Sequence, residues 1–155
     1  GPAIENGFYY DFDLPEPAKA EDLPDLEKRM RRIIRQDLSF EGRQVSFQEA
    51  RDFFKKKNQP YKLNLIDDLE MYGTTDVHAH EKSQMSAVKG QRLKSVSLYQ
   101  TGDFIDLCRG GHVENTREIP DDAFRLTKIA GAYWRGSESQ PMLTRIYGVA
   151  FRTKK

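Results

Sequence analysis

Residues 102–113 have the sequence GDFIDLCRGGHV, which joins a short strand pattern to a turn. The stretch opens with strand-like alternation, and the paired glycines Gly110 and Gly111 then permit a tight turn, since glycine adopts positive φ at little steric cost. Cys108 and His112 stand four residues apart on either side of these glycines. That spacing brings the two side chains together on one face of a helix or across the turn. We therefore expect them to act on one ligand.

The sequence around this stretch predicts an α+β fold with mainly antiparallel strands. Leu23, Leu26, Met30, Ile33 and Ile34 recur at helical spacing and predict an amphipathic helix over residues 22–37. Ser46 and Glu49 form a capping-box pattern that begins a second helix ending near Asn58. Alternating aromatic, aliphatic and polar residues predict strands over 6–13, 40–45, 96–107, 124–134 and 143–151.

The chain length of 155 residues suits one domain with one core, which we place at residues 1–151. Residues 73–90 are polar and contain Gly and Ser without a clear period, so we expect a surface insertion near 70–92. The basic residues 152–155 are expected to begin a linker to a further domain.

Composition excludes several classes of protein. The 25 Lys and Arg residues nearly balance the 24 Asp and Glu residues, so any contact with nucleic acid must be local. No apolar run approaches the roughly 18–20 residues that span a bilayer, and the first residues lack a secretory signal, which predicts no membrane partner and a cytoplasmic location. One cysteine excludes an internal disulfide.

Three kinds of chemistry are open for Cys108 and His112. Together with His78 and His80 they make a conceivable zinc site, although the pair alone supplies only two of the three or four ligands that zinc needs. A cysteine nucleophile with a histidine base is a second possibility, with Arg109 or the glycine amides as oxyanion donors. A buried cysteine beside a glycine turn is the third. Asp103 or Asp106 would then orient the imidazole, bind a substrate amine or hydroxyl, or cap a turn.

Residues 106–113, DLCRGGHV, resemble the Asp-Leu-Cys-Arg-Gly-Pro-His-Val motif of threonyl-tRNA synthetases, with Gly111 in place of the usual proline. The resemblance extends to GPAIENGFYYD at 1–11, AGAYWRG at 130–136 and LTRIYG at 143–148. Alanyl-tRNA synthetases and free-standing alanyl-tRNA editing proteins share the Cys-x-x-x-His element but typically lack the last two blocks, so an alanyl-type editing protein ranks lower.

The resemblance implies the second N-terminal, or editing, domain of a threonyl-tRNA synthetase: an α+β domain whose antiparallel sheet packs around a long helix. It implies an aminoacyl-tRNA hydrolase that clears seryl-tRNA(Thr), with no cofactor, and with zinc at Cys108 and His112 as the alternative. Matched to the family's motifs, the editing site comprises Lys62, Asp106, Cys108 and His112.

The family's His-x-x-x-His motif lies upstream of the block that begins here at Gly1, and this sequence contains no such motif. We therefore expect this stretch by itself to be hampered in catalysis, with a non-catalytic tRNA-binding module as the alternative function.

The partners implied are the seryl-tRNA(Thr) acceptor end and the catalytic and anticodon-binding domains of the parent synthetase, in which ATP-dependent activation resides. Candidate tRNA contacts are Arg109, Tyr133, Trp134 and Arg135, together with Arg92, Lys94 and Lys128. Trp134 is also a candidate for the core. The arginines between 29 and 35 are typical of a solvated helix face.

Overall fold

The computed structural model describes residues 3–4, 6–76 and 93–151. Chain contacts divide it into two compact units, the first formed by Gly1–Leu38 with Val113–Lys155 and the second by Ser39–His112. Unit 2 is thus inserted into the chain of unit 1. Each unit combines helix with an antiparallel sheet, which confirms the predicted α+β class. Chain length predicts a single core. The strands instead form two separate sheets.

Unit 1 is built on a four-stranded antiparallel sheet in the order β1-β2-β7-β6. Its strands are β1 (Ala3–Ile4), β2 (Gly7–Phe12), β6 (Phe124–Tyr133) and β7 (Met142–Ala150). Three short 3-10 helices, η1 (Ala20–Asp22), η2 (Thr116–Glu118) and η3 (Trp134–Gly136), lie in its connections.

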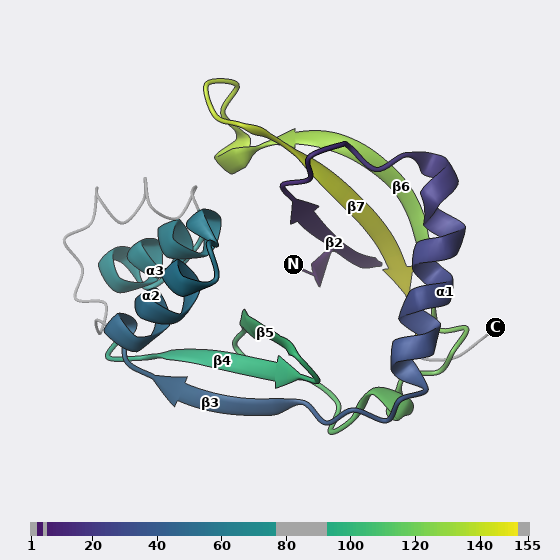
Figure 1. The fold of residues 1–155 in the computed structure, drawn as a ribbon, viewed down its shortest axis with the longest axis horizontal. Coiled ribbons are helices and arrows are strands. Elements are labelled where there is room, and N and C mark those ends of the chain that lie inside the picture. Colours follow the sequence, from purple (N-terminus) through teal and green to yellow (C-terminus); the bar gives the residue numbers. More distant parts are fainter. Residues whose placement is uncertain (1–2, 5, 77–92, 152–155) are drawn as a thin grey trace. The chain divides into compact units, whose positions relative to one another are not determined.

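Helix α1 (Leu23–Ile34) packs along β6 (Figure 1). Its Glu27 carboxylate accepts a hydrogen bond from the buried Leu126 amide at 2.8 Å and another from Arg31 at 2.9 Å. The helix ends three residues before the predicted residue 37, and Asp37 has φ of 56°. The buried carboxylate therefore ties the helix to the sheet.

A cross-strand ion pair joins the central strands of unit 1. Asp11 of β2 faces Arg145 of β7, and the two contacts between their side chains measure 2.6 and 2.8 Å. The guanidinium also lies over the Tyr9 ring, 4.0 Å from its centroid. Hydrogen bonding to Asp11 raises the pKa of Arg145 above its ordinary value, despite the opposing effect of burial. Arg145 therefore remains charged throughout the accessible pH range.

Unit 2 places two helices beside a three-stranded antiparallel sheet in the order β3-β4-β5. The strands are β3 (Glu41–Val45), β4 (Val96–Thr101) and β5 (Phe104–Leu107), and the helices are α2 (Phe47–Lys56) and α3 (Pro60–Tyr72). Ser46 caps α2 by accepting from the Glu49 amide at 3.1 Å, which confirms the predicted helix start. The Glu49 carboxylate binds Arg43. Gly73, with φ of 72°, ends α3.

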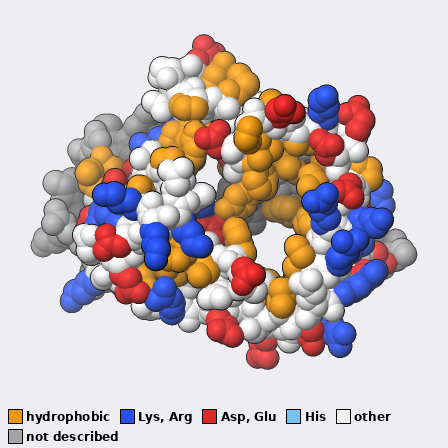
Figure 2. All heavy atoms as spheres, viewed as in Figure 1, with side chains coloured by type: hydrophobic (Ala, Val, Ile, Leu, Met, Phe, Trp, Pro, Cys, Tyr) orange, Lys and Arg blue, Asp and Glu red, His pale blue; other side chains and the backbone are white. Residues whose placement is uncertain are grey.

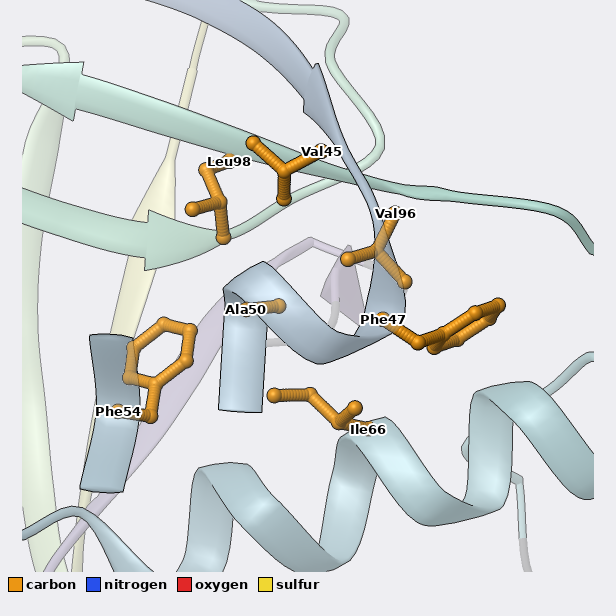
Figure 3. Close-up of a cluster of buried hydrophobic side chains, with 7 residues drawn as sticks. All are labelled: Val45, Phe47, Ala50, Phe54, Ile66, Val96 and Leu98. Carbon is orange, nitrogen blue, oxygen red and sulfur yellow. The ribbon is translucent and has the colours of Figure 1, made fainter. Parts of the chain in front are cut away.

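The core of unit 2 lies between α2, α3 and one face of the sheet. Ala50 and Phe54 from α2 and Ile66 from α3 lie close to the sheet residues Val96 and Leu98 (Figure 3). Side chains alternate across a strand, so the neighbours of these sheet residues lie on the other face. The core therefore fixes which side chains of β4 and β5 remain available for a site.

Several predictions fall outside the described residues, namely most of the insertion near 70–92, with His78, His80 and Arg92, and the start of a linker at 152–155.

Basic and acidic side chains are interspersed on the face that Figure 2 shows, in keeping with the net charge of +1. Across the residues that the structure describes, no helix is long and apolar enough to cross a membrane.

Candidate functional site

Cys108 and His112 approach each other across the glycine turn, not along a helix. Strand β5 ends at Leu107, and the Cys108 amide continues its pairing by donating to the Ser97 carbonyl at 3.2 Å. Gly110 and Gly111 follow with φ of 100° and 82°. Across these two glycines, the Cys108 Sγ lies 3.2 Å from the His112 Nε2. The sequence prediction of a close pair is thus met by the turn geometry.

The residue at position 111 matters to this turn. A proline ring holds φ near about −65°, whereas Gly111 has φ of 82°. The turn seen here is therefore one that the proline of the usual family motif does not permit. A proline at position 111 would therefore require a different backbone conformation here.

Lys62 and Asp106 form a second close pair in the same unit. The Lys62 Nζ lies 2.6 Å from the Asp106 Oδ1, and the side chains are only 19% and 15% exposed. The same carboxylate oxygen accepts from the Leu107 amide at 2.7 Å. Lys62 comes from the first turn of α3, and β5 is an edge strand, so the lysine can reach its end. The pair carries no net charge but places an ammonium group in a sheltered position.

Each pair has one member at the end of β5 or directly after it. Asp106 and Cys108 are two residues apart in extended chain, so both point to the same side of the sheet. Tyr99 lies opposite Asp106 in the register of β4 and β5 and therefore shares that side. Four functional groups from the predicted site thus collect within unit 2: an amine, a carboxylate, a thiol and an imidazole.

Two aromatic rings that the sequence analysis did not identify contact His112. The Phe40 ring is stacked on the imidazole, with centroids 5.0 Å apart and planes inclined by 4°. The Tyr99 ring is tilted by 58° at 4.5 Å. The alternation of β4 was the available signal for Tyr99, but Phe40 precedes β3 and only the tertiary structure brings it to His112.

The described residues show only part of the surroundings that the alternative chemistries of the pair require, since His78 and His80 lie outside them. Within residues 3–4, 6–76 and 93–151, no cluster of three or more His, Cys, Asp or Glu side chains is arranged to hold a metal ion. Asp106 pairs with Lys62, and Asp103 lies in the exposed turn between β4 and β5. Arg109 is exposed beside the glycine turn. Cys108 is half-buried, which differs from the fully buried structural cysteine considered above.

Lys94, a candidate for tRNA contact in unit 2, is exposed. Apart from Arg109, the other described candidates belong to unit 1. Tyr133 ends β6 and is 37% exposed, while Trp134 is half-buried and absent from the buried core. The Arg135 guanidinium lies 5.9 Å from the centroid of the Trp134 ring, and Arg135 has φ of 56°. Lys128 lies over the Tyr147 ring. Each of these two cations thus lies near an aromatic ring.

The basic helix has largely structural contacts. Arg29 pairs with Asp25, Arg31 with Glu27, and Arg35 with Asp121. This supports the interpretation of the arginines as an ordinary helix face.

Comparisons with known proteins give a consistent picture. Residues 96–147 match the family described as the threonyl and alanyl tRNA synthetase second additional domain. The chain is 47% identical over 154 residues to a threonine--tRNA ligase of Dehalococcoides mccartyi, covering 99% of this chain and 22% of the relative. The corresponding protein of Thermotoga petrophila is 44% identical over 156 residues, covering 100% and 20%. A Gloeobacter violaceus threonine--tRNA ligase is 45% identical over 153 residues, covering 99% and 21%.

The chain thus spans about a fifth of the length of these curated relatives. The matches include the DLCRGGHV turn, the end of β5 and the aromatic end of β6. Over residues 96–147 the chain matches the second additional domain of threonyl and alanyl tRNA synthetases, and over nearly its whole length it is similar to a part of threonine--tRNA ligases.

Proposed function

We propose that this chain is the editing domain of a threonyl-tRNA synthetase and that it hydrolyses the ester of seryl-tRNA(Thr). The observation that carries the proposal is that Asp106 and Cys108, two residues apart at the end of β5, pair with Lys62 and His112 respectively. The relatives are threonine--tRNA ligases, in which such a reaction would protect the product.

The need for such a reaction follows from the substrates. Serine and threonine differ by one methyl group, which a binding pocket discriminates by only about 1–3 kcal/mol. A synthetase for threonine therefore attaches serine at a rate that translation cannot tolerate. A separate hydrolytic site that accepts serine and excludes the larger side chain removes the error.

The proposed reaction is attack by water on the ester carbonyl. The Lys62 ammonium is placed to stabilise the negative charge that develops on the carbonyl oxygen. The Asp106 carboxylate, which can accept several hydrogen bonds, binds the seryl ammonium as well as Lys62. Cys108 and His112 form the wall against which the serine side chain lies. The water carries out the attack directly, because an ester needs no covalent enzyme intermediate.

The acceptor end of tRNA(Thr) is the proposed macromolecular partner. Its terminal bases would stack on exposed rings, and its phosphates would meet local cations, which accords with the near-zero net charge. Arg109 is the candidate beside the pocket, and Tyr133, Trp134 and Arg135 are the candidates in unit 1. The catalytic and anticodon-binding domains of the parent enzyme are the proposed covalent partners.

The test is deacylation of seryl-tRNA(Thr), measured for this chain and for any longer protein that contains it. We expect the longer protein to release serine and to leave threonyl-tRNA(Thr) intact, and we expect this chain alone to be slower. If both bind the tRNA acceptor end and neither deacylates it, the chain is a tRNA-binding module and the editing assignment fails. Release of alanine-type substrates in preference to serine would favour the alanyl-type alternative.

A further inference from the structure

We propose that Phe40 and Tyr99 are positioning residues that hold the His112 imidazole so that its Nε2 faces the Cys108 thiol. The inference rests on the proposed function only for its catalytic consequence, since the arrangement itself is a property of unit 2. It assigns a role to two residues that lie outside the family-like motif at 106–113.

The His112 side chain needs such support because it is exposed. An exposed imidazole on a glycine-rich turn is free to change rotamer, and ordering a side chain costs conformational entropy. Here the Phe40 ring lies parallel to the imidazole, inclined by only 4°, and the Tyr99 ring meets it at 58°. Two rings at different inclinations restrict both the translation and the rotation of the imidazole. The 3.2 Å contact between Nε2 and the Cys108 Sγ is the orientation that results.

The Tyr99 ring fills the space left by the missing side chains of two glycines. A Cβ atom added at Gly42, its cross-strand neighbour, would lie 2.6 Å from the Tyr99 Cζ. A Cβ atom added at Gly110 would lie 2.7 Å from the Tyr99 hydroxyl oxygen. The ring therefore occupies space that exists only because both positions lack a side chain. This gives Gly42, far from the motif in sequence, a defined connection to His112 through Tyr99.

The consequence for chemistry is a fixed edge to the proposed serine pocket. Tyr99 lies opposite Asp106 in the register of β4 and β5, and its ring contacts the imidazole, so it links the two parts of the proposed site. With the imidazole held, the thiol and Nε2 present a constant surface to a small side chain. An imidazole free to swing would open space for an additional methyl group and weaken the exclusion of threonine.

Nuclear magnetic resonance of His112 in the full 155-residue chain tests the arrangement directly. Stacking on Phe40 should shift the imidazole carbon-bound protons upfield through the ring current. Phe40→Leu and Tyr99→Leu should each move these resonances toward the values of a free histidine, while Phe40→Tyr should retain the shift. Phe104→Leu is the matched control, because Phe104 lies in the same unit and is 62% exposed.

Gly42→Ala provides an independent route to the same ring. The added methyl group should displace the Tyr99 ring and alter the His112 resonances without changing either aromatic residue. The dispersion of the amide resonances shows whether Phe40→Leu folds. If it does not fold, the Gly42→Ala variant still tests the proposal. His112 resonances that stay in place in folded Phe40→Leu, Tyr99→Leu and Gly42→Ala would overturn the proposal.

The catalytic consequence is measured in a longer protein that contains this chain. Loss of one ring contact should raise the hydrolysis of threonyl-tRNA(Thr) relative to seryl-tRNA(Thr) on the order of fivefold, and Phe40→Tyr should restore the discrimination. If the resonances move but no protein deacylates the tRNA, the editing function fails and the positioning of His112 stands. If deacylation is present and the discrimination is unchanged in the variants whose resonances moved, the catalytic part of this inference is wrong.

Discussion

Lys62 and Asp106 form the most sheltered ion pair of the site, with side chains 19% and 15% exposed. Removing one partner leaves the other charge poorly solvated, so Lys62→Met and Asp106→Asn should each lower the free energy of unfolding by about 1–3 kcal/mol. Loss of a charge-stabilising donor should also reduce seryl-tRNA(Thr) hydrolysis by about 100-fold or more. Urea denaturation and single-turnover deacylation measure the two effects.

Arg43→Met is the matched control for these substitutions. Arg43 also forms an ion pair in unit 2, with Glu49, but the two side chains are 54% and 52% exposed. Exposed pairs contribute about 0–1 kcal/mol, so the control should change stability little and hydrolysis not at all. A Lys62→Met protein that keeps full activity would remove Lys62 from the proposed mechanism.

Cys108 distinguishes water attack from the nucleophile and metal hypotheses. Because the proposed reaction does not pass through the thiol, Cys108→Ser should retain deacylation to within about tenfold, as expected for a change in pocket shape alone. If Cys108 were the nucleophile or a ligand of an essential zinc ion, the Cys108→Ser variant would lose almost all activity. Elemental analysis of the purified chain supplies the second measurement: we expect no stoichiometric zinc, and one zinc per chain would contradict this expectation.

At the scale of elements, the pair between Asp11 and Arg145 links β2 to β7 in unit 1. Arg145→Met should lower the free energy of unfolding by about 2 kcal/mol, since Asp11 then loses both contacts in a largely covered position. The substitution also removes the cation over the Tyr9 ring. Thermal and urea denaturation of the variant provide the measurement.

The pH dependence of this pair follows from the raised pKa of Arg145. A basic group with a raised folded-state pKa contributes stability below its unfolded pKa and loses it only as the pH passes the folded value. Both values lie above the working range, so the difference between wild type and Arg145→Met should stay constant from neutral to mildly alkaline pH. A difference that disappears on moderate alkalinisation would contradict the assignment.

At the scale of the whole molecule, the chain comprises two units, with unit 2 inserted between Leu38 and Val113. Phe54 is fully buried in the core of unit 2. Phe54→Ala should cost about 3–5 kcal/mol. Amide hydrogen exchange should show the loss of protection first in Ser39–His112, if each unit opens as its own cooperative segment. Equal loss of protection in both units would indicate a single cooperative structure.

Local patterns were sufficient to predict most elements. The alternation around 6–13, 40–45 and 124–134 corresponds to β2, β3 and β6, because side-chain period is a property of neighbouring residues. Ser46 marks the start of α2 for the same reason: its hydroxyl acts on an amide three residues away. The division into two sheets was not predictable, since strand pairing depends on contacts between residues far apart in the chain.

The contacts of the candidate site likewise fall into two groups, those that the local sequence predicts and those that only the packing of distant segments creates. The sequence by itself predicted that Cys108 and His112 would be close, because their spacing of four brings them together on a helix face or across a turn that two glycines allow, and resemblance added Lys62 and Asp106. The tertiary structure decided that Lys62 from α3 reaches Asp106 and that Phe40 and Tyr99 enclose the imidazole. Such contacts depend on how helices and strands pack, which no single segment encodes, whereas the glycine turn is fixed by backbone sterics within a few residues.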